Sequence, residues 1–189
     1  MFFFFVSEVI SENKINFNEI LNIYDQGNYE KTFKILKEQE PKNDPRVLNL
    51  IGEMFFNGDY VDQNYATSAS YFEKAAQQDY TTALLNLGIM YEEGYFFSQD
   101  LKKANEFFMK AHELGNHYGT YYLAVNMQFG HGITKDIEKS INFYKQAIKM
   151  GNESASIDLG YLYVNGDEIE PDYEKGYKLF LPLAERGVS

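Results

Sequence analysis

The sequence predicts an all-α fold in which antiparallel helix pairs stack side by side into a solenoid. One observation is a pattern that recurs four times at intervals of 36 residues without a slip. A second is the placement of glycine, since ten of the 14 glycines occupy equivalent positions of this pattern. Repeats of about 20–50 residues are typical of solenoids, in which each unit buries its apolar faces only against its neighbours.

The first helix of each copy is marked by a large apolar residue followed by a small one. The four pairs are Ile51-Gly52, Leu87-Gly88, Leu123-Ala124 and Leu159-Gly160. Glycine in a helix interior costs about 0.5–1 kcal/mol relative to alanine, so its recurrence predicts that a second helix approaches closely there. Seven residues after each apolar residue stands a glycine that can take the left-handed conformation at a helix end: Gly58, Gly94, Gly130 and Gly166.

The second helix of each copy begins at a short polar residue and carries a pair of large apolar residues. The polar residues, which can accept hydrogen bonds from the free amides of a helix start, are Asn64, Asp100, Asp136 and Asp172. The apolar pairs are Tyr71-Phe72, Phe107-Phe108, Phe143-Tyr144 and Leu179-Phe180. The helix is expected to close at Asp79, Gly115, Gly151 and Gly187. Each copy is therefore interpreted as helix, glycine turn, helix and closing turn.

The second copy shows the pattern most completely. It contains Leu87-Gly88-Ile89-Met90-Tyr91-Glu92-Glu93-Gly94, then Asp100, Lys103-Ala104, Phe107-Phe108, Lys110-Ala111 and Gly115-Asn116. This unit resembles the Sel-1-like repeat, an α/α relative of the tetratricopeptide repeat, and four copies are assigned to residues 45–80, 81–116, 117–152 and 153–189. The third copy departs from the family pattern at Ala124 and Met127, and the first at Asp79. The resemblance implies a right-handed α/α superhelix.

The residues before the first copy show a weaker version of the same architecture. The stretch 16–44 resembles a degenerate tetratricopeptide unit on the basis of Tyr24, Gly27-Asn28-Tyr29, Thr32, Ile35, Leu36 and Pro41. We interpret it as a helical hairpin that caps the stack. Residues 1–15 form an apolar segment whose phenylalanines are expected to pack on the first helices, with a signal-peptide remnant or a membrane tether as alternatives. At the other end, either further repeats or self-association are expected to cover the last unit.

Composition and charge narrow the classes of partner. Of the 189 residues, 44% are hydrophobic, and 17 Lys and Arg against 28 Asp and Glu leave a net charge of -11. Nucleic acids and anionic membranes need a positive binding face, so a basic or mixed-charge protein is the expected partner.

The absence of cysteine excludes disulfides, thiolate metal sites and cysteine nucleophiles. No stretch approaches the about 18 consecutive apolar residues of a membrane-spanning helix. The sequence does not fix the cellular compartment of the protein, although it favours the cytoplasm.

The resemblance also implies which residues bind a partner. In this family the first helix of each unit lines a concave face, which places the residues around each apolar–small pair in a groove. The expected partner-binding residues are Asn49, Glu53, Phe56, Leu85, Ile89, Glu92, Glu93, Tyr121, Val125, Gln128, Phe129, Ile157, Tyr161 and Val164. Glu92 and Glu93, together with Glu53, are expected to clamp a lysine or arginine of the partner, or else to be solvated charges at a helix end.

Catalytic signatures are missing from the sequence. The three histidines, His112, His117 and His131, form no HExxH pair, and neither GxSxG nor a phosphate-loop lysine occurs. We therefore predict no catalytic residue, no metal and no cofactor.

The sequence favours a non-enzymatic scaffold or adaptor that binds another protein or a peptide in the groove. One alternative is an inhibitor or immunity protein that neutralises a toxin by occupying its active site, because strong negative charge speeds the capture of a basic enzyme. A further alternative is an enzyme whose site is hidden in the variations between repeats.

Overall fold

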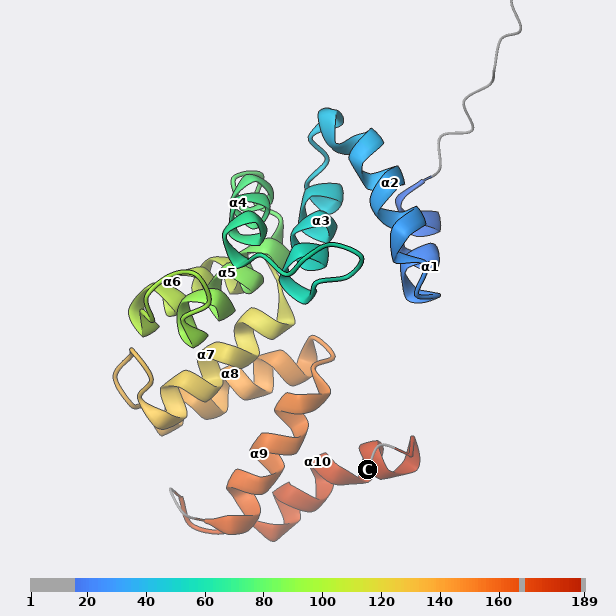
Figure 1. The fold of residues 1–189 in the computed structure, drawn as a ribbon. Helices are drawn as coiled ribbons and strands as arrows, with labels where there is room; N and C mark the ends of the chain where they lie inside the picture. Colours follow the sequence, from blue (N-terminus) through green and yellow to red (C-terminus); the bar gives the residue numbers. More distant parts are fainter. Residues whose placement is uncertain (1–15, 167–168, 188–189) are drawn as a thin grey trace, which may run out of the picture.

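The computed structural model describes residues 16–166 and 169–187, so the apolar segment predicted for residues 1–15 lies outside the described part. The described residues form α-helices joined by loops and one short 3-10 helix (Glu40–Lys42), without any strand (Figure 1). The α-helices are α1 (Phe17–Asp25), α2 (Tyr29–Gln39), α3 (Pro45–Asn57), α4 (Tyr65–Ala76), α5 (Thr81–Glu93), α6 (Leu101–Glu113), α7 (His117–Phe129), α8 (Ile137–Lys149), α9 (Glu153–Asn165) and α10 (Tyr173–Glu185). The predicted all-α fold class is confirmed.

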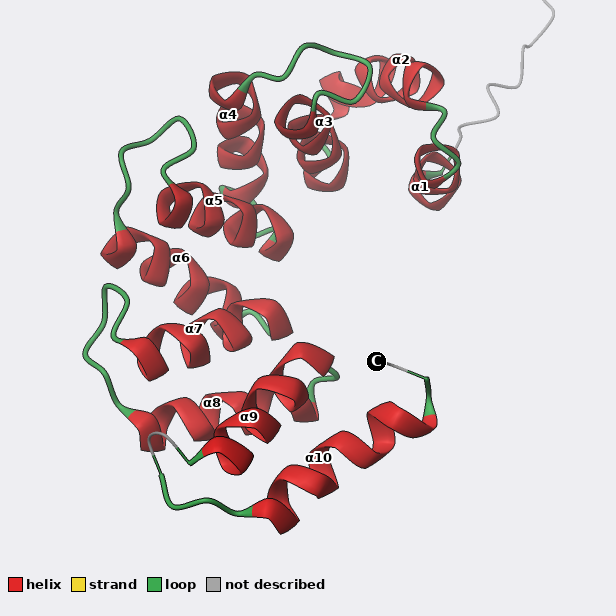
Figure 2. Ribbon diagram, turned by 60° about the horizontal axis from the view of Figure 1, so that its bottom comes forward, coloured by secondary structure: helices red, strands yellow, loops and turns green. Residues whose placement is uncertain are grey.

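The helices pack in series. Extensive contacts join helices that are adjacent in the sequence, such as α3 with α4 and α4 with α5. Figure 2 shows the result, a curved row of helices with α1 at one end and α10 at the other. We call α3, α5, α7 and α9 the first helices of the four copies, and α4, α6, α8 and α10 the second helices. Each helix pair thus packs against the pairs that precede and follow it, as in a solenoid.

The helix ends form as their turn residues predict. The residues that follow the first helices adopt the left-handed conformation, with φ between 68° and 82°: Gly58, Gly94, Gly130 and Gly166. Each second helix begins with a capping side chain that accepts a hydrogen bond from the backbone N–H three residues further on. The capping residues are Asn64, Asp100, Asp136 and Asp172. Each of these caps satisfies one of the amides that a helix start leaves without a partner.

In three of the four copies, the glycine of the first helix lies directly against an aromatic ring of the second helix. A Cβ atom built on Gly88 would lie 2.4 Å from Cε1 of Phe108, which is too close for two carbon atoms. The contact recurs in the first and fourth copies, at 2.7 and 2.5 Å, between Gly52 and Phe72 and between Gly160 and Phe180. The predicted close approach of the two helices is therefore confirmed, and the ring fills the space that a methyl group would need.

The pair α1–α2 is joined to the first copy by two tyrosines and a shared core. The Tyr24 hydroxyl donates to Oδ2 of Asp59 at 2.6 Å, and the Tyr71 hydroxyl donates to Oε1 of Glu40 at 2.7 Å. Ile20 of α1 is fully buried and belongs to the same apolar cluster as the residues of α3 and α4. The pair thus packs at the N-terminal end of the row of helices.

Replacing Gly88 with alanine is expected to destabilise the fold, because the added methyl group overlaps the ring of Phe108. Overpacking of this kind costs about 1–3 kcal/mol, which exceeds the about 0.5–1 kcal/mol by which alanine favours a helix. Chemical denaturation followed by circular dichroism measures the change. The pair Gly88→Ala/Phe108→Leu is expected to lose less stability than the sum of the single changes, and strict additivity would contradict the contact.

Candidate functional site

Three cavities lie between successive first helices. Their volumes are about 210 Å³ between α3 and α5, about 420 Å³ between α5 and α7, and about 350 Å³ between α7 and α9. We name each cavity by its two helices, as the α3–α5, α5–α7 and α7–α9 cavities. The surface that they form together is called the groove face.

Charge is segregated between the two kinds of helix. α5, α7 and α9 contain no lysine or arginine, and the only basic residue of α3 is Arg46 in its first turn. The acidic and histidine side chains that line the three cavities are Glu53, Glu92, Glu93, Asp158 and His131. The second helices carry most lysines, and some pair with acidic residues there, as Lys139 does with Asp136 at 3.0 Å. The groove face is therefore negative.

A polar cluster joins α3 to α5 at their cavity. Nδ2 of Asn49 donates to Oε1 of Glu53 at 2.8 Å. Nδ2 of Asn86 donates to Oδ1 of Asn49 at 3.1 Å and to Oε1 of Glu53 at 3.4 Å. Burial raises the pKa of the Glu53 carboxyl, although the hydrogen bonds from the two amides act in the opposite direction. Glu53 thus helps to join two units as well as lining a cavity.

The α5–α7 cavity combines two carboxylates with two tyrosines. Nδ2 of Asn126 donates to Oε1 of Glu92 at 3.0 Å. Burial raises the pKa of the Glu92 carboxyl, the hydrogen bond from Asn126 lowers it, and the charge of Glu93 raises it again. Glu93 is exposed, and Tyr121 and Tyr122 line the same cavity. The arrangement leaves one carboxylate accessible to a cation beside half-buried aromatic surface.

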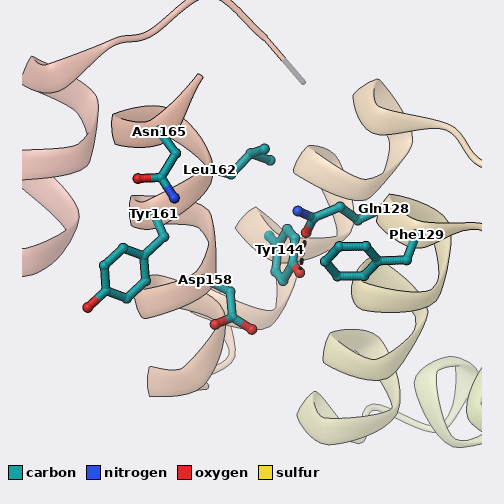
Figure 3. A pocket seen from close by; sticks show the side chains of 7 residues that line it. All are labelled: Gln128, Phe129, Tyr144, Asp158, Tyr161, Leu162 and Asn165. Atoms are coloured by element: carbon teal, nitrogen blue, oxygen red, sulfur yellow. Dashed lines mark hydrogen bonds between the residues drawn. The ribbon is translucent and has the colours of Figure 1, made fainter. Parts of the chain in front are cut away.

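Two exposed aromatic rings flank the α7–α9 cavity. Phe129 and Tyr161 are each 55% exposed, and Figure 3 shows them on opposite sides of the cavity with Asp158 and Tyr144 between them. The Tyr121 hydroxyl donates to Oδ2 of Asp158 at 2.8 Å. Burial raises the pKa of Tyr121 well above its usual value, and the hydrogen bond to Asp158 adds to the effect, so this hydroxyl keeps its proton at neutral pH.

The structure divides the expected partner-binding residues by exposure. Glu93, Phe129 and Tyr161 are exposed. The half-buried residues are Glu53, Phe56, Ile89, Glu92, Tyr121, Val125, Gln128, Ile157 and Val164. Asn49 and Leu85, which are 4% and 8% exposed, are buried instead of facing the groove. The physical reason is that Asn49 is hydrogen-bonded to Asn86 of α5, and that Leu85 belongs to an apolar cluster with residues of α6 and α7.

The three acidic residues expected to act together do not share one cavity. Glu53 lines the α3–α5 cavity, whereas Glu92 and Glu93 line the α5–α7 cavity. Glu53 and Glu92 each accept a hydrogen bond from an asparagine of the following first helix, so they face different neighbours. The cavities thus separate Glu53 from Glu92 and Glu93, and a clamp formed by all three carboxylates stays a prediction.

Sequence reasoning missed several residues that line the cavities. Tyr144 comes from a second helix, α8, and Asp158 and Asn86 stand one position after expected groove residues. A signal for the last two was present, because the polar contacts Asn49–Asn86 and Tyr121–Asp158 each join residues that are 37 apart. Pairs of polar residues one position beyond the 36-residue spacing mark contacts between neighbouring first helices.

The histidines and the acidic residues form no metal centre in the part of the chain that is described. Within residues 16–166 and 169–187, no group of three or more His, Asp or Glu side chains could hold a metal ion. His112 contacts the Thr120 hydroxyl through Nδ1 at 2.8 Å instead. In the same ranges, every helix is too short or too polar to cross a bilayer.

Helix pairs stacked in series, with cavities between their first helices, define an α/α-repeat solenoid. The model of the Sel1 repeat matches four stretches of the sequence, 45–80, 81–116, 117–152 and 154–188. These matches cover most of the chain, and the protein belongs to the Sel1 repeat family.

Several solved structures are similar to this one. A Sel1 repeat protein from Oxalobacter formigenes is 26% identical, with a TM-score of 0.82 over 91% of this chain and 70% of that chain. A protective antigen present in uropathogenic Escherichia coli strains, with an SLR fold, is 24% identical, with a TM-score of 0.74 over 90% of this chain and 38% of that chain. Helicobacter pylori cysteine rich protein B is 27% identical, with a TM-score of 0.51 over 64% and 91% of the two chains. No curated protein sequence matches the chain.

Replacing Glu53 with glutamine is expected to stabilise the protein at neutral pH. Burial raises the folded-state pKa of Glu53, so the protonated carboxyl favours the folded state. This stabilisation is fully present below the unfolded pKa and is lost as the pH rises through the folded pKa, and at neutral pH the buried charge therefore destabilises the fold. Glutamine keeps an acceptor for Asn49 and Asn86 without the charge. The melting temperature is expected to rise by about 2–4 °C at neutral pH.

Thermal unfolding of the native chain and of Glu53→Gln at two pH values checks this expectation. The gain should disappear at about pH 3, clearly below the unfolded pKa of about 4.3, because the carboxyl group is then protonated in both states. Glu93→Gln, at an exposed carboxylate of the neighbouring cavity, serves as the control. A gain of the same size at both pH values would show that burial of the Glu53 charge is not its cause.

Proposed function

We propose that this chain is a non-enzymatic scaffold that binds a partner protein along the groove face. Sel1 repeat proteins are generally scaffolds for protein interactions. The observation that carries the proposal is the row of cavities between the first helices, in which aromatic rings and acidic side chains are accessible together. Protein-binding surfaces use the same combination of aromatic anchors and a polar rim.

The charge distribution supports a basic or mixed-charge segment as the part of the partner that is bound. Glu92, Glu93 and Asp158 line the two larger cavities, and neither cavity is lined by lysine or arginine. A negative face attracts positive segments and repels polyanions such as nucleic acids. The net charge of -11 for the whole chain acts in the same direction.

Phe129 and Tyr161 are the proposed anchors. Each leaves 55% of its surface accessible, so each has a large apolar area to bury on contact. Tyr121 lines a cavity and also joins two units, because its hydroxyl donates a hydrogen bond to Asp158 and so connects α7 to α9. Truncation of Tyr121 would mix a loss of binding with a loss of packing, whereas truncation of the two exposed rings leaves the contacts between units in place.

A narrower form of the proposal is an inhibitor or immunity protein that neutralises a toxin or effector enzyme. The negative groove face supports this form, because negative charge speeds the capture of an enzyme with a basic surface. Protection of cells from such an enzyme, lost when Phe129 and Tyr161 are truncated, would distinguish it from a scaffold that only brings proteins together.

The double change Phe129→Ala/Tyr161→Ala is expected to weaken partner binding by at least about tenfold, since aromatic anchors at the centre of an interface contribute more than about 1 kcal/mol each. Affinity capture from a lysate of the source cells, with quantitative mass spectrometry, identifies proteins retained by the native chain. Titration of each retained protein then gives the change in Kd.

The matched control is Tyr173→Ala/Tyr177→Ala, which removes two rings of α10 that are 68% and 63% exposed and line none of the three cavities. Circular dichroism verifies that both double variants keep the helical content. A partner that binds the Phe129 and Tyr161 variant as tightly as the native chain would show that the groove face is not the binding surface.

A further inference from the structure

We propose that the α7–α9 cavity takes an arginine side chain of the partner, held by the carboxylate of Asp158 and the ring of Phe129, with Tyr161 at the border of the cavity. This inference rests on the proposed function and specifies the chemical group that one cavity of the groove face recognises. The cavity, of about 350 Å³, has room for a single long side chain and opens between two aromatic residues (Figure 3).

Asp158 is a carboxylate without a cation of its own. Its Oδ2 accepts a hydrogen bond from the Tyr121 hydroxyl at 2.8 Å, and in residues 16–166 and 169–187 no lysine or arginine forms an ion pair with it. Covering a carboxylate with apolar groups is costly, because the charge loses water and gains no partner. A side chain that docks over half-buried Asp158 therefore has to bring positive charge or hydrogen-bond donors.

The two aromatic rings are held in place by rings behind them. The ring of Phe129 stacks on His131, with centroids 5.6 Å apart and planes inclined by 24°. The ring of Tyr161 packs against the edge of Phe180, with centroids 5.3 Å apart. Aromatic faces attract cations, and rings that are already oriented lose little freedom when a ligand arrives. Figure 3 shows the ring of Phe129 directed toward Asp158 and the ring of Tyr161 directed away from it, so Phe129 supplies the aromatic face on the cavity side and Tyr161 borders the opening.

Arginine suits this arrangement better than lysine. Its guanidinium is planar, stacks on aromatic rings and carries five N–H donors, whereas the lysine ammonium is compact and strongly hydrated. The cavity offers several acceptors, namely the Asp158 carboxylate, the Asn165 side chain and the Tyr144 hydroxyl oxygen. That hydroxyl already donates its proton to Oε1 of Gln128 at 2.8 Å, so only its lone pairs are left for a ligand.

The neighbouring α5–α7 cavity lacks part of this combination. Glu92 is engaged by Asn126, and the tyrosines that line the cavity, Tyr121 and Tyr122, are half-buried. Among the three cavities of the groove face, as far as the chain is described, two exposed rings on either side of a carboxylate occur between α7 and α9 alone. The arginine is therefore assigned to this position of the groove.

Titration of the full chain with N-acetyl-arginine methylamide, followed by two-dimensional amide NMR, tests the proposal. Saturable shifts are expected for the amides of residues 128–131 and 158–165. N-acetyl-citrulline methylamide, which has a similar shape but no charge, is expected to bind at least about tenfold more weakly. The lysine analogue is expected to bind about threefold more weakly than the arginine probe, because it cannot stack or donate in the same plane.

Two variants separate the contributions of charge and ring. Asp158→Asn keeps an acceptor for Tyr121 and is expected to weaken arginine binding at least about tenfold, as the loss of a charged partner does. Phe129→Ala leaves the charge and removes the ring directed toward Asp158, with an expected loss of about fivefold. Tyr177→Ala is the matched control, since this ring of α10 is 63% exposed and lines none of the groove cavities.

The proposal is overturned if citrulline binds as tightly as arginine, if Asp158→Asn leaves the affinity unchanged, or if the shifts centre on Glu92 and Glu93. In that event, partner capture that still depends on Phe129 and Tyr161 would show that the groove function stands without an arginine site. Arginine binding that is lost in Asp158→Asn and kept in Tyr177→Ala supports the site, whatever the lysate capture yields.

Discussion

In three of the four units, the contact between a glycine of the first helix and an aromatic ring of the second helix determines how closely the two helices approach. At Gly88 the ring of Phe108 occupies the space that a Cβ atom would need, and the ring itself is fully buried. Because a solenoid unit packs only against its neighbours, the thickness of each unit also sets the spacing between successive first helices. The cavities of the groove face lie in that spacing, so their size depends on this contact.

Polar side chains then align each first helix with the next. Side-chain hydrogen bonds connect the four first helices in turn, among them Asn86 to Asn49, Asn126 to Glu92 and Tyr121 to Asp158. A buried polar group that loses its partner costs more than an ordinary contact, and Asn126 is only 1% exposed. One relative rotation of the units is thereby favoured over others. The same contacts hold Glu92 and Asp158 at the walls of the cavities, so the alignment of the units and the lining of the cavities depend on shared residues.

The separation of charge follows from where the lysines find partners. Lys139 pairs with Asp136 and Lys175 with Asp172, at the start of α8 and α10, where each aspartate also accepts a backbone amide. One residue therefore caps a helix and neutralises a lysine of the same turn. The carboxylates of the groove face have no such basic partner among the described residues, so their charge stays available to another molecule. This asymmetry gives the two faces of the solenoid different charge.

The amino-acid sequence alone specified the features that lie within one unit: the 36-residue repeat, the glycine turns, the helix caps and the close approach at Gly88. Those features follow from local backbone conformation and from spacing along a helix. Only the tertiary structure decided that Asn49 and Leu85 are buried, that the Tyr121 hydroxyl bonds to Asp158, and that Phe129 and Tyr161 flank one cavity. The exposure of a side chain on the groove face depends on the rotation between successive units. That rotation is set by contacts between side chains of two units, and the repeat period within one unit carries no information about it.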